Sequence, residues 1–263
     1  MIEASSESPA LWMRDVRPPA AAPALRATAF EYSSRGDRVP GMLLLPADGA
    51  GPFPLALVQH GAGGSKDAAY LDAVRLRWVE RGIAVASIDF PLHGERASAK
   101  LTEQLLAMLG PGTRPSADAV ALFGEFARQS IADLARAVDV LGSLPEIDAE
   151  RVAYVGFSLG AILGSLYVPY DPRVRAAVLA VGGAGIGPAS IDPTAHIGRF
   201  APRPLLLVNA SRDERIPRRA AEALHAAAGD PKEIEWFDAG HTDLPGAALK
   251  RMWSFLATHL RVA

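Results

Sequence analysis

The segment Gly156-Phe157-Ser158-Leu159-Gly160 stands between an apolar run at 152–155 and a helix-compatible stretch at 161–166. A strand, a sharp turn centred on a serine and then a helix form the context in which this G-x-S-x-G pattern exposes a serine hydroxyl. The turn strains the backbone at the serine, and the two glycines avoid collisions with neighbouring elements. It also places the N–H of Leu159 at a helix N-terminus, where it can stabilise an oxyanion. The segment therefore predicts an exposed, nucleophilic Ser158.

Short apolar runs alternate with helical stretches along most of the chain. The predicted strands cover residues 28–33, 39–45, 55–58, 83–88, 152–155, 176–181, 205–208 and 233–237. The predicted helices cover residues 68–81, 126–144, 161–166, 220–228 and 247–259. This alternation predicts an α/β fold with a mostly parallel sheet and helices on both faces. The first two strands, joined by a tight turn, predict an N-terminal antiparallel hairpin.

The composition of the chain divides it into a short N-terminal segment and one long segment in which predicted strands and helices alternate. Residues 1–26 are rich in proline, alanine and serine and predict an extended N-terminal tail. No repeat or linker interrupts residues 27–263, so we expect a single α/β domain there. Residues 97–125 are less regular and leave two interpretations open, a small helical lid over the site or ordinary surface helices.

Composition excludes several classes of partner and chemistry. The net charge of −2 does not indicate a basic surface for binding nucleic acid. No apolar run approaches the roughly 18 residues needed for membrane insertion. The absence of cysteine excludes disulfides, thiolate metal sites and a cysteine nucleophile. The acidic start of the chain is not a secretory signal, so we expect a cytoplasmic protein. The sequence does not indicate an oligomeric state.

A serine hydroxyl needs a neighbouring base, and the base needs an orienting group. In folds with this turn, the acid and then the histidine follow the serine in the chain. Asp213 and His241 each come just after a predicted strand, and parallel strands end at one edge of the sheet. We therefore expect Ser158, Asp213 and His241 to meet as a catalytic triad. Asp238 and Asp243 are the rival acids, but both lie close to His241 in sequence.

A second oxyanion donor is expected from the loop after the strand at 55–58, which reads His60-Gly61-Ala62-Gly63-Gly64. Small residues let the backbone approach a substrate carbonyl closely, and we assign the N–H of Ala62, with Gly63 as the alternative. Apolar residues predict an uncharged acyl pocket around the site. These rim residues are Leu92, Phe157, Leu159, Ile186 and Ile191.

Together these motifs resemble the α/β-hydrolase superfamily, and within it the dienelactone-hydrolase-like and prolyl-oligopeptidase-like esterases. The resemblance spans residues 28–260 and includes the segments 89–96 and 147–152 besides the site motifs. Dienelactone hydrolases proper use a cysteine nucleophile, whereas this chain has Ser158. Prolyl-oligopeptidase-like peptidases carry an additional propeller domain, for which this chain has no room. The resemblance thus implies a stand-alone carboxylic-ester hydrolase.

The expected reaction is hydrolysis of a small-molecule ester through an acyl-enzyme, which requires no metal or organic cofactor. The same triad could serve a peptidase, an amidase or an acyltransferase, and substrate preference separates these. A non-catalytic binding module of the same fold is a further alternative. It would call for a broken triad, and every expected residue type is present here.

Overall fold

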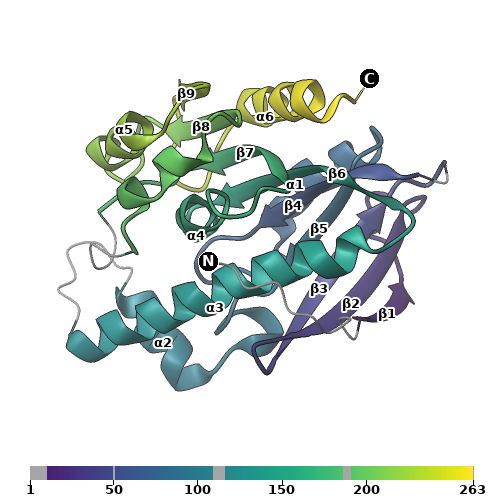
Figure 1. Ribbon diagram of the computed structural model, residues 1–263, viewed down its shortest axis with the longest axis horizontal. Coiled ribbons are helices and arrows are strands. Elements are labelled where there is room, and N and C mark those ends of the chain that lie inside the picture. The colour runs from purple at the N-terminus through teal and green to yellow at the C-terminus, as the bar shows by residue number, and fades with distance from the viewer. Residues whose placement is uncertain (1–10, 50, 109–115, 186–190, 263) are drawn as a thin grey trace.

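The computed structural model describes residues 11–49, 51–108, 116–185 and 191–262. Within these residues nine strands form one sheet, in the order β1-β2-β3-β5-β4-β6-β7-β8-β9 (Figure 1). The strands are β1 (Leu11–Val16), β2 (Arg26–Ser34), β3 (Asp37–Leu45), β4 (Phe53–Gln59), β5 (Ala84–Ile88), β6 (Ile147–Phe157), β7 (Val174–Ala180), β8 (Leu205–Ala210) and β9 (Lys232–Phe237).

Strand directions confirm the predicted mostly parallel sheet with an antiparallel N-terminal part. β1, β2, β3 and β5 pair antiparallel, whereas β5, β4, β6, β7, β8 and β9 pair parallel. β4 pairs with β5 on one side and β6 on the other, so the chain reverses its direction of travel across the sheet at β4. In open α/β sheets such a reversal leaves a crevice at the carboxyl ends of the strands. The loops after β4 and β6 meet there.

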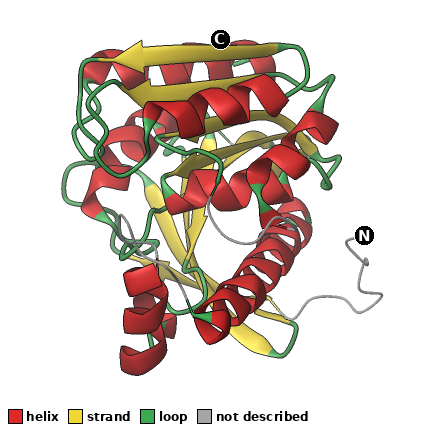
Figure 2. Cartoon of the chain, turned by 90° about the vertical axis from the view of Figure 1, so that its left-hand side faces the viewer, coloured by secondary structure: helices red, strands yellow, loops and turns green. Residues whose placement is uncertain are grey.

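Helices cover both faces of this twisted sheet (Figure 2). They are α1 (Ala69–Val79), α2 (Ala99–Met108), α3 (Ala117–Gly142), α4 (Leu159–Tyr167), α5 (Arg218–Ala227) and α6 (Gly246–Leu260). One buried cluster joins the sheet to α1 and α6, and a second joins the opposite face to α2, α3, α4 and α5. Successive strand residues point to opposite faces, which explains why the central strands are apolar throughout.

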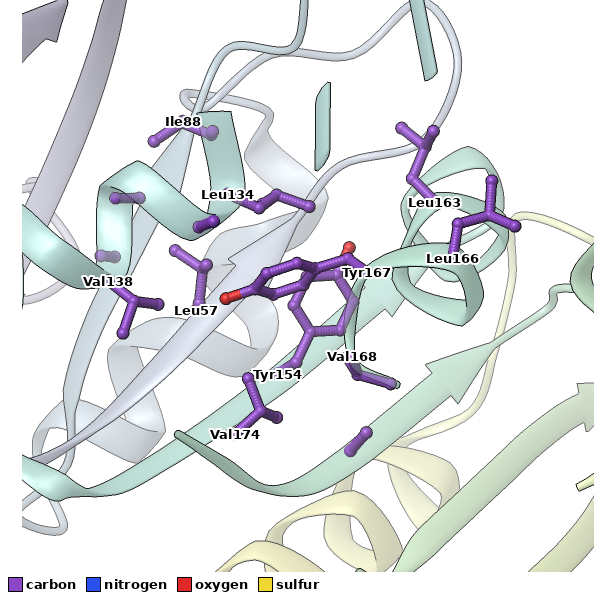
Figure 3. Close-up of a cluster of buried hydrophobic side chains, with 14 of the residues drawn as sticks. Leu57, Ile88, Leu134, Val138, Tyr154, Leu163, Leu166, Tyr167, Val168 and Val174 are labelled. Atoms are coloured by element: carbon purple, nitrogen blue, oxygen red, sulfur yellow. The ribbon is translucent and has the colours of Figure 1, made fainter. Parts of the chain in front are cut away.

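The core beneath α4 fixes the position of the turn at Ser158. Tyr154 and Tyr167 are fully buried and stack edge to face, with ring centroids 5.7 Å apart, between the sheet and α4 (Figure 3). The Tyr154 hydroxyl donates a 2.6 Å hydrogen bond to the carbonyl of Gly160 in the first turn of α4. Burying each such side chain stabilises the fold by about 1.5–3 kcal/mol. α4 is therefore anchored to β6 at its N-terminus, where the site lies.

Two segments differ from the sequence-based expectation. Residues 11–16 of the expected tail form strand β1, which pairs with β2, while residues 1–10 lie outside the described residues. Trp12 and Met13 on this edge strand are exposed, so it lacks the apolar alternation that would have identified it. α3 begins at Ala117, nine residues before the predicted start, with the hydroxyl of Ser116 accepting from the N–H of Ala119. No helix of the described segments is long and apolar enough to cross a bilayer.

Candidate active site

The turn between β6 and α4 holds Ser158 in an uncommon conformation. Its φ of 52° and ψ of −111° lie outside the regions that residues with a Cβ prefer. Such strain costs about 1–3 kcal/mol and persists only where the surroundings impose it. The Ser158 N–H donates to the carbonyl of Ala180 at 2.9 Å, and its own carbonyl accepts from the N–H of Ile162 at 3.0 Å. The serine is thus fixed between β7 and α4.

Glycine is required at position 156 because the backbone of α4 passes directly over it. A Cβ there would lie 2.3 Å from the carbonyl oxygen of Gly160 and 2.4 Å from its carbon. We expect Gly156→Ala to lower the free energy of unfolding by about 3 kcal/mol or more, measured by urea denaturation. Gly246→Ala is the control, since a Cβ at Gly246 meets no heavy atom within 4 Å and should change stability by about 1 kcal/mol at most. Equal stability of the two variants would contradict the tight turn.

The structure brings Ser158, Asp213 and His241 together at the carboxyl edge of the sheet. The Oγ of Ser158 lies 2.8 Å from the Nε2 of His241. On the other side of the ring, Nδ1 lies 2.8 Å and 2.9 Å from the two carboxylate oxygens of Asp213. The side chains of His241 and Asp213 are 9% and 5% exposed, so water screens their interaction weakly. With Nδ1–H donating to Asp213, Nε2 is free to accept the serine proton.

Asp213 is held independently of the histidine. Its Oδ1 also accepts hydrogen bonds from the N–H groups of Arg215 and Ile216, each at 2.8 Å. The rival Asp238 lies on the surface, with its side chain 82% exposed and paired with Arg212. Among these carboxylates, Asp213 is the one within hydrogen-bond reach of His241.

The loop after β4 lies against the serine. A Cβ on Gly61 would come within 3.2 Å of the Ser158 Cβ, so only glycine allows this approach without displacement. In the described part of the chain, the N–H of Ala62 has no hydrogen-bond acceptor. Leu159 is the first residue of α4, where N–H groups lack a helical acceptor. Ala62 borders the cavity beside Ser158 and Gly63 does not, which favours Ala62 over the alternative.

The buried side chain of His60 supports the loop after β4 through two hydrogen bonds. The Nδ1–H of His60 donates to the carbonyl of Gly61 at 2.8 Å, and Nε2 accepts from the N–H of Phe90 at 3.3 Å. Burial lowers the pKa of His60 to about 3. The ring therefore stays neutral near pH 7, as it must in order to accept at Nε2.

The loop at 89–96 is braced by hydrogen bonds and by an ion pair. The buried carboxylate of Asp89 accepts from the N–H groups of Lys66 and Glu95, at 2.7 Å and 2.9 Å. The Arg96 guanidinium donates to the carbonyl of Asp89 and to the carboxylate of Asp133. These contacts tie the loops after β4 and β5 to α3. They give this segment a structural role beside the site.

A cavity of about 460 Å³ opens beside the serine and the histidine, between α1 and α6. It is lined by Gly61, Ala62, Tyr70, Ala73, Val74, Phe157, Ser158, Val181, Arg215, His241, Thr242, Leu244 and Leu249. Most of these side chains are apolar, and the polar ones are Tyr70, Ser158, Arg215, His241 and Thr242. Such a shape suits a small, largely uncharged molecule.

Most of the predicted rim residues do not line this cavity. Phe157 does, whereas Leu92, Leu159 and Ile191 pack into the core on the α3 side, and Ile186 lies outside the described residues. The prediction was wrong for those three because the cavity opens on the opposite face of the sheet. Sequence analysis missed the residues of α1 and α6 that form its walls, since a cavity wall and a buried helix face have the same apolar pattern.

Residues 97–125 contribute α2 and the start of α3, and residues 109–115 lie outside the described residues. None of the described residues in this range lines the cavity. A lid role for this segment stays a prediction. Among the described residues, no group of three or more histidine, cysteine, aspartate or glutamate side chains is arranged to hold a metal ion.

Comparison with known proteins identifies the family. The profile of the dienelactone hydrolase family matches residues 98–244, more than half of the chain. This chain belongs to the dienelactone hydrolase family. The matched range contains Ser158, Asp213 and His241, but not the loop at Ala62. No curated protein sequence matches the chain significantly.

Solved structures share the α/β-hydrolase fold over nearly the whole of this family member. A cold-adapted esterase from an Arctic intertidal metagenomic library is similar with a TM-score of 0.75 and 21% identity, covering 94% of this chain and 97% of the esterase. Acetyl xylan esterase from Paenibacillus sp. R4 is similar with a TM-score of 0.78 and 19% identity, and the match covers 96% of this chain and 90% of that enzyme. Acetyl xylan esterase 1 from Thermoanaerobacterium sp. is similar with a TM-score of 0.76 and 17% identity, and the match covers 96% of this chain and 89% of that enzyme. At these identities the likeness establishes the fold.

Proposed function

We propose that this protein hydrolyses carboxylic esters of small molecules through an acyl-enzyme formed on Ser158. The observation that carries the proposal is the continuous hydrogen-bonded chain from Ser158 Oγ through both nitrogens of His241 to Asp213. A serine hydroxyl within reach of an oriented imidazole is the arrangement that generates an oxygen nucleophile near neutral pH. Membership of a hydrolase family supports the same reaction class.

In the proposed acylation step, Ser158 Oγ attacks the ester carbonyl while Nε2 of His241 takes its proton. Asp213 fixes the ring tautomer and stabilises the imidazolium that forms. The N–H groups of Leu159 and Ala62 donate to the oxygen that becomes negative in the tetrahedral intermediate. His241 then returns the proton to the leaving alcohol. In deacylation, water attacks the carbonyl of the acyl-enzyme, His241 takes a proton from the water and returns it to Ser158, and the carboxylic acid is released.

The cavity indicates the substrate class. Its apolar walls offer burial to an uncharged acyl or alcohol group, and each buried CH₂ contributes about 0.8 kcal/mol. A volume of about 460 Å³ accommodates a small molecule and excludes a folded polypeptide. We therefore infer a small-molecule ester with an apolar acyl or alcohol group as the substrate.

The test is a panel of p-nitrophenyl esters of increasing acyl length, beside the p-nitroanilides of the same acyl groups. We expect turnover of the esters, rising with acyl length until the cavity is filled, and little turnover of the anilides. Preferred cleavage of the anilides would favour the amidase alternative. Faster acyl transfer to an added alcohol than to water would favour the acyltransferase alternative.

A further inference from the structure

Tyr70 stands in the first turn of α1, at the wall of the cavity that holds Ser158 and His241. Its ring meets the ring of Phe157 edge to face, with centroids 6.0 Å apart. The residue is 47% exposed. The exposed part of Tyr70 forms a wall that a bound molecule would contact.

The hydroxyl of Tyr70 is tied to the loop beside the serine. The N–H of Gly61 donates a 2.7 Å hydrogen bond to the Tyr70 oxygen. Gly61 precedes Ala62, the proposed oxyanion donor, and packs against Ser158. Because the bond from Gly61 uses an acceptor site of the hydroxyl, the Tyr70 proton remains available for donation. Among the described residues no acceptor takes it.

The Tyr70 hydroxyl keeps its proton near neutral pH. Burial of the hydroxyl end raises the pKa of Tyr70, although the bond from Gly61 acts in the opposite direction. A phenol with a pKa above its ordinary value of about 10 is a donor throughout the physiological range.

We infer that Tyr70 is a further catalytic residue, whose hydroxyl donates a hydrogen bond to the substrate oxygen on which negative charge develops. The inference rests on the proposed ester hydrolysis and adds a side-chain donor to the backbone donors of Leu159 and Ala62. The chain from Gly61 N–H to the Tyr70 hydroxyl to the substrate is cooperative, because each bond polarises the next. Since the charge develops in the transition state, the hydroxyl should act on kcat more than on KM.

Tyr70→Phe keeps the ring against Phe157 and removes the hydroxyl. Loss of one oxyanion donor costs about 100-fold in kcat, and we expect that loss with KM changed by less than about threefold. Tyr170→Phe is the matched control. Tyr170 is likewise an exposed tyrosine, and its hydroxyl is hydrogen-bonded to Arg199 and His196, but it does not line the cavity. The control should retain wild-type kcat.

A fluorinated tyrosine at position 70 separates donation to substrate from support of the loop. Its more acidic phenol becomes a phenolate at lower pH, and a phenolate still accepts from Gly61 but has no proton to donate. We expect kcat to fall at alkaline pH in the wild type, with the fall shifted to lower pH by fluorination and absent in Tyr70→Phe. This comparison needs only the near-native fluorinated protein, even if the phenylalanine variant folds poorly.

An alkaline profile that fluorination does not move, or wild-type kcat in folded Tyr70→Phe, would overturn the inference. Neither result would contradict the proposed ester hydrolysis, because that proposal depends on Ser158. Conversely, ester turnover that is indifferent to Ser158 would remove the proposed function itself, whatever Tyr70 does.

Discussion

Replacing Ser158 with alanine is expected to lower kcat for ester hydrolysis by about a million-fold, which is the scale seen when a triad nucleophile is removed. The serine, the histidine and the aspartate form one hydrogen-bonded chain, so they act as a unit. We therefore expect the Ser158→Ala/His241→Ala double variant to be no slower than Ser158→Ala alone. Steady-state kinetics of the two single variants and the double variant measure this directly.

The control for that experiment is stability. Oγ of Ser158 donates no bond that supports the fold, so Ser158→Ala should unfold at a temperature close to that of the wild type. Multiplicative losses in the double variant would mean that the two side chains act independently, which would contradict the triad.

Asp213→Asn is expected to lower kcat by about ten-thousand-fold. An amide at this position can donate to Nδ1 and so favour the tautomer with its proton on Nε2, which cannot accept from the serine. Asp238→Asn is the matched control, because Asp238 lies near His241 in sequence yet its side chain is 82% exposed. We expect Asp238→Asn to stay within about threefold of wild-type kcat.

The Asp238 variant also tests the choice between rival acids. If Asp238→Asn lost most activity and Asp213→Asn little, Asp213 would not be the acid of the triad, and its hydrogen bonds with His241 would not contribute to catalysis. Circular dichroism of both variants would establish that the comparison is between folded proteins.

Much of the fold could be predicted because local patterns and global topology agree. Apolar or strand-like runs alternating with helical stretches predicted β4 to β9 and a mostly parallel sheet, and the G-x-S-x-G context predicted the turn at Ser158. The meeting of Ser158, Asp213 and His241 followed from a topological rule, since each side chain comes just after a strand of one sheet. Their catalytic roles are predictions that the variants above test.

The sequence was less informative wherever tertiary contacts decide the outcome. β1 carries exposed Trp12 and Met13, and only its pairing with β2 makes it a strand. The position of the cavity between α1 and α6 depends on how two helices distant in sequence approach each other. The hydrogen bond from the N–H of Gly61 to the Tyr70 hydroxyl is another such tertiary contact, and no motif marks it.

The central claim is that Ser158 is the covalent nucleophile, and a fluorophosphonate probe tests it most directly. Mass spectrometry of the digested wild-type protein should find a single phosphonyl group, on the peptide that contains Ser158. The Ser158→Ala protein should remain unlabelled, and the label should form far more slowly in His241→Ala. A label on another residue, or an unlabelled Ser158 in a preparation that still hydrolyses esters, would contradict the account.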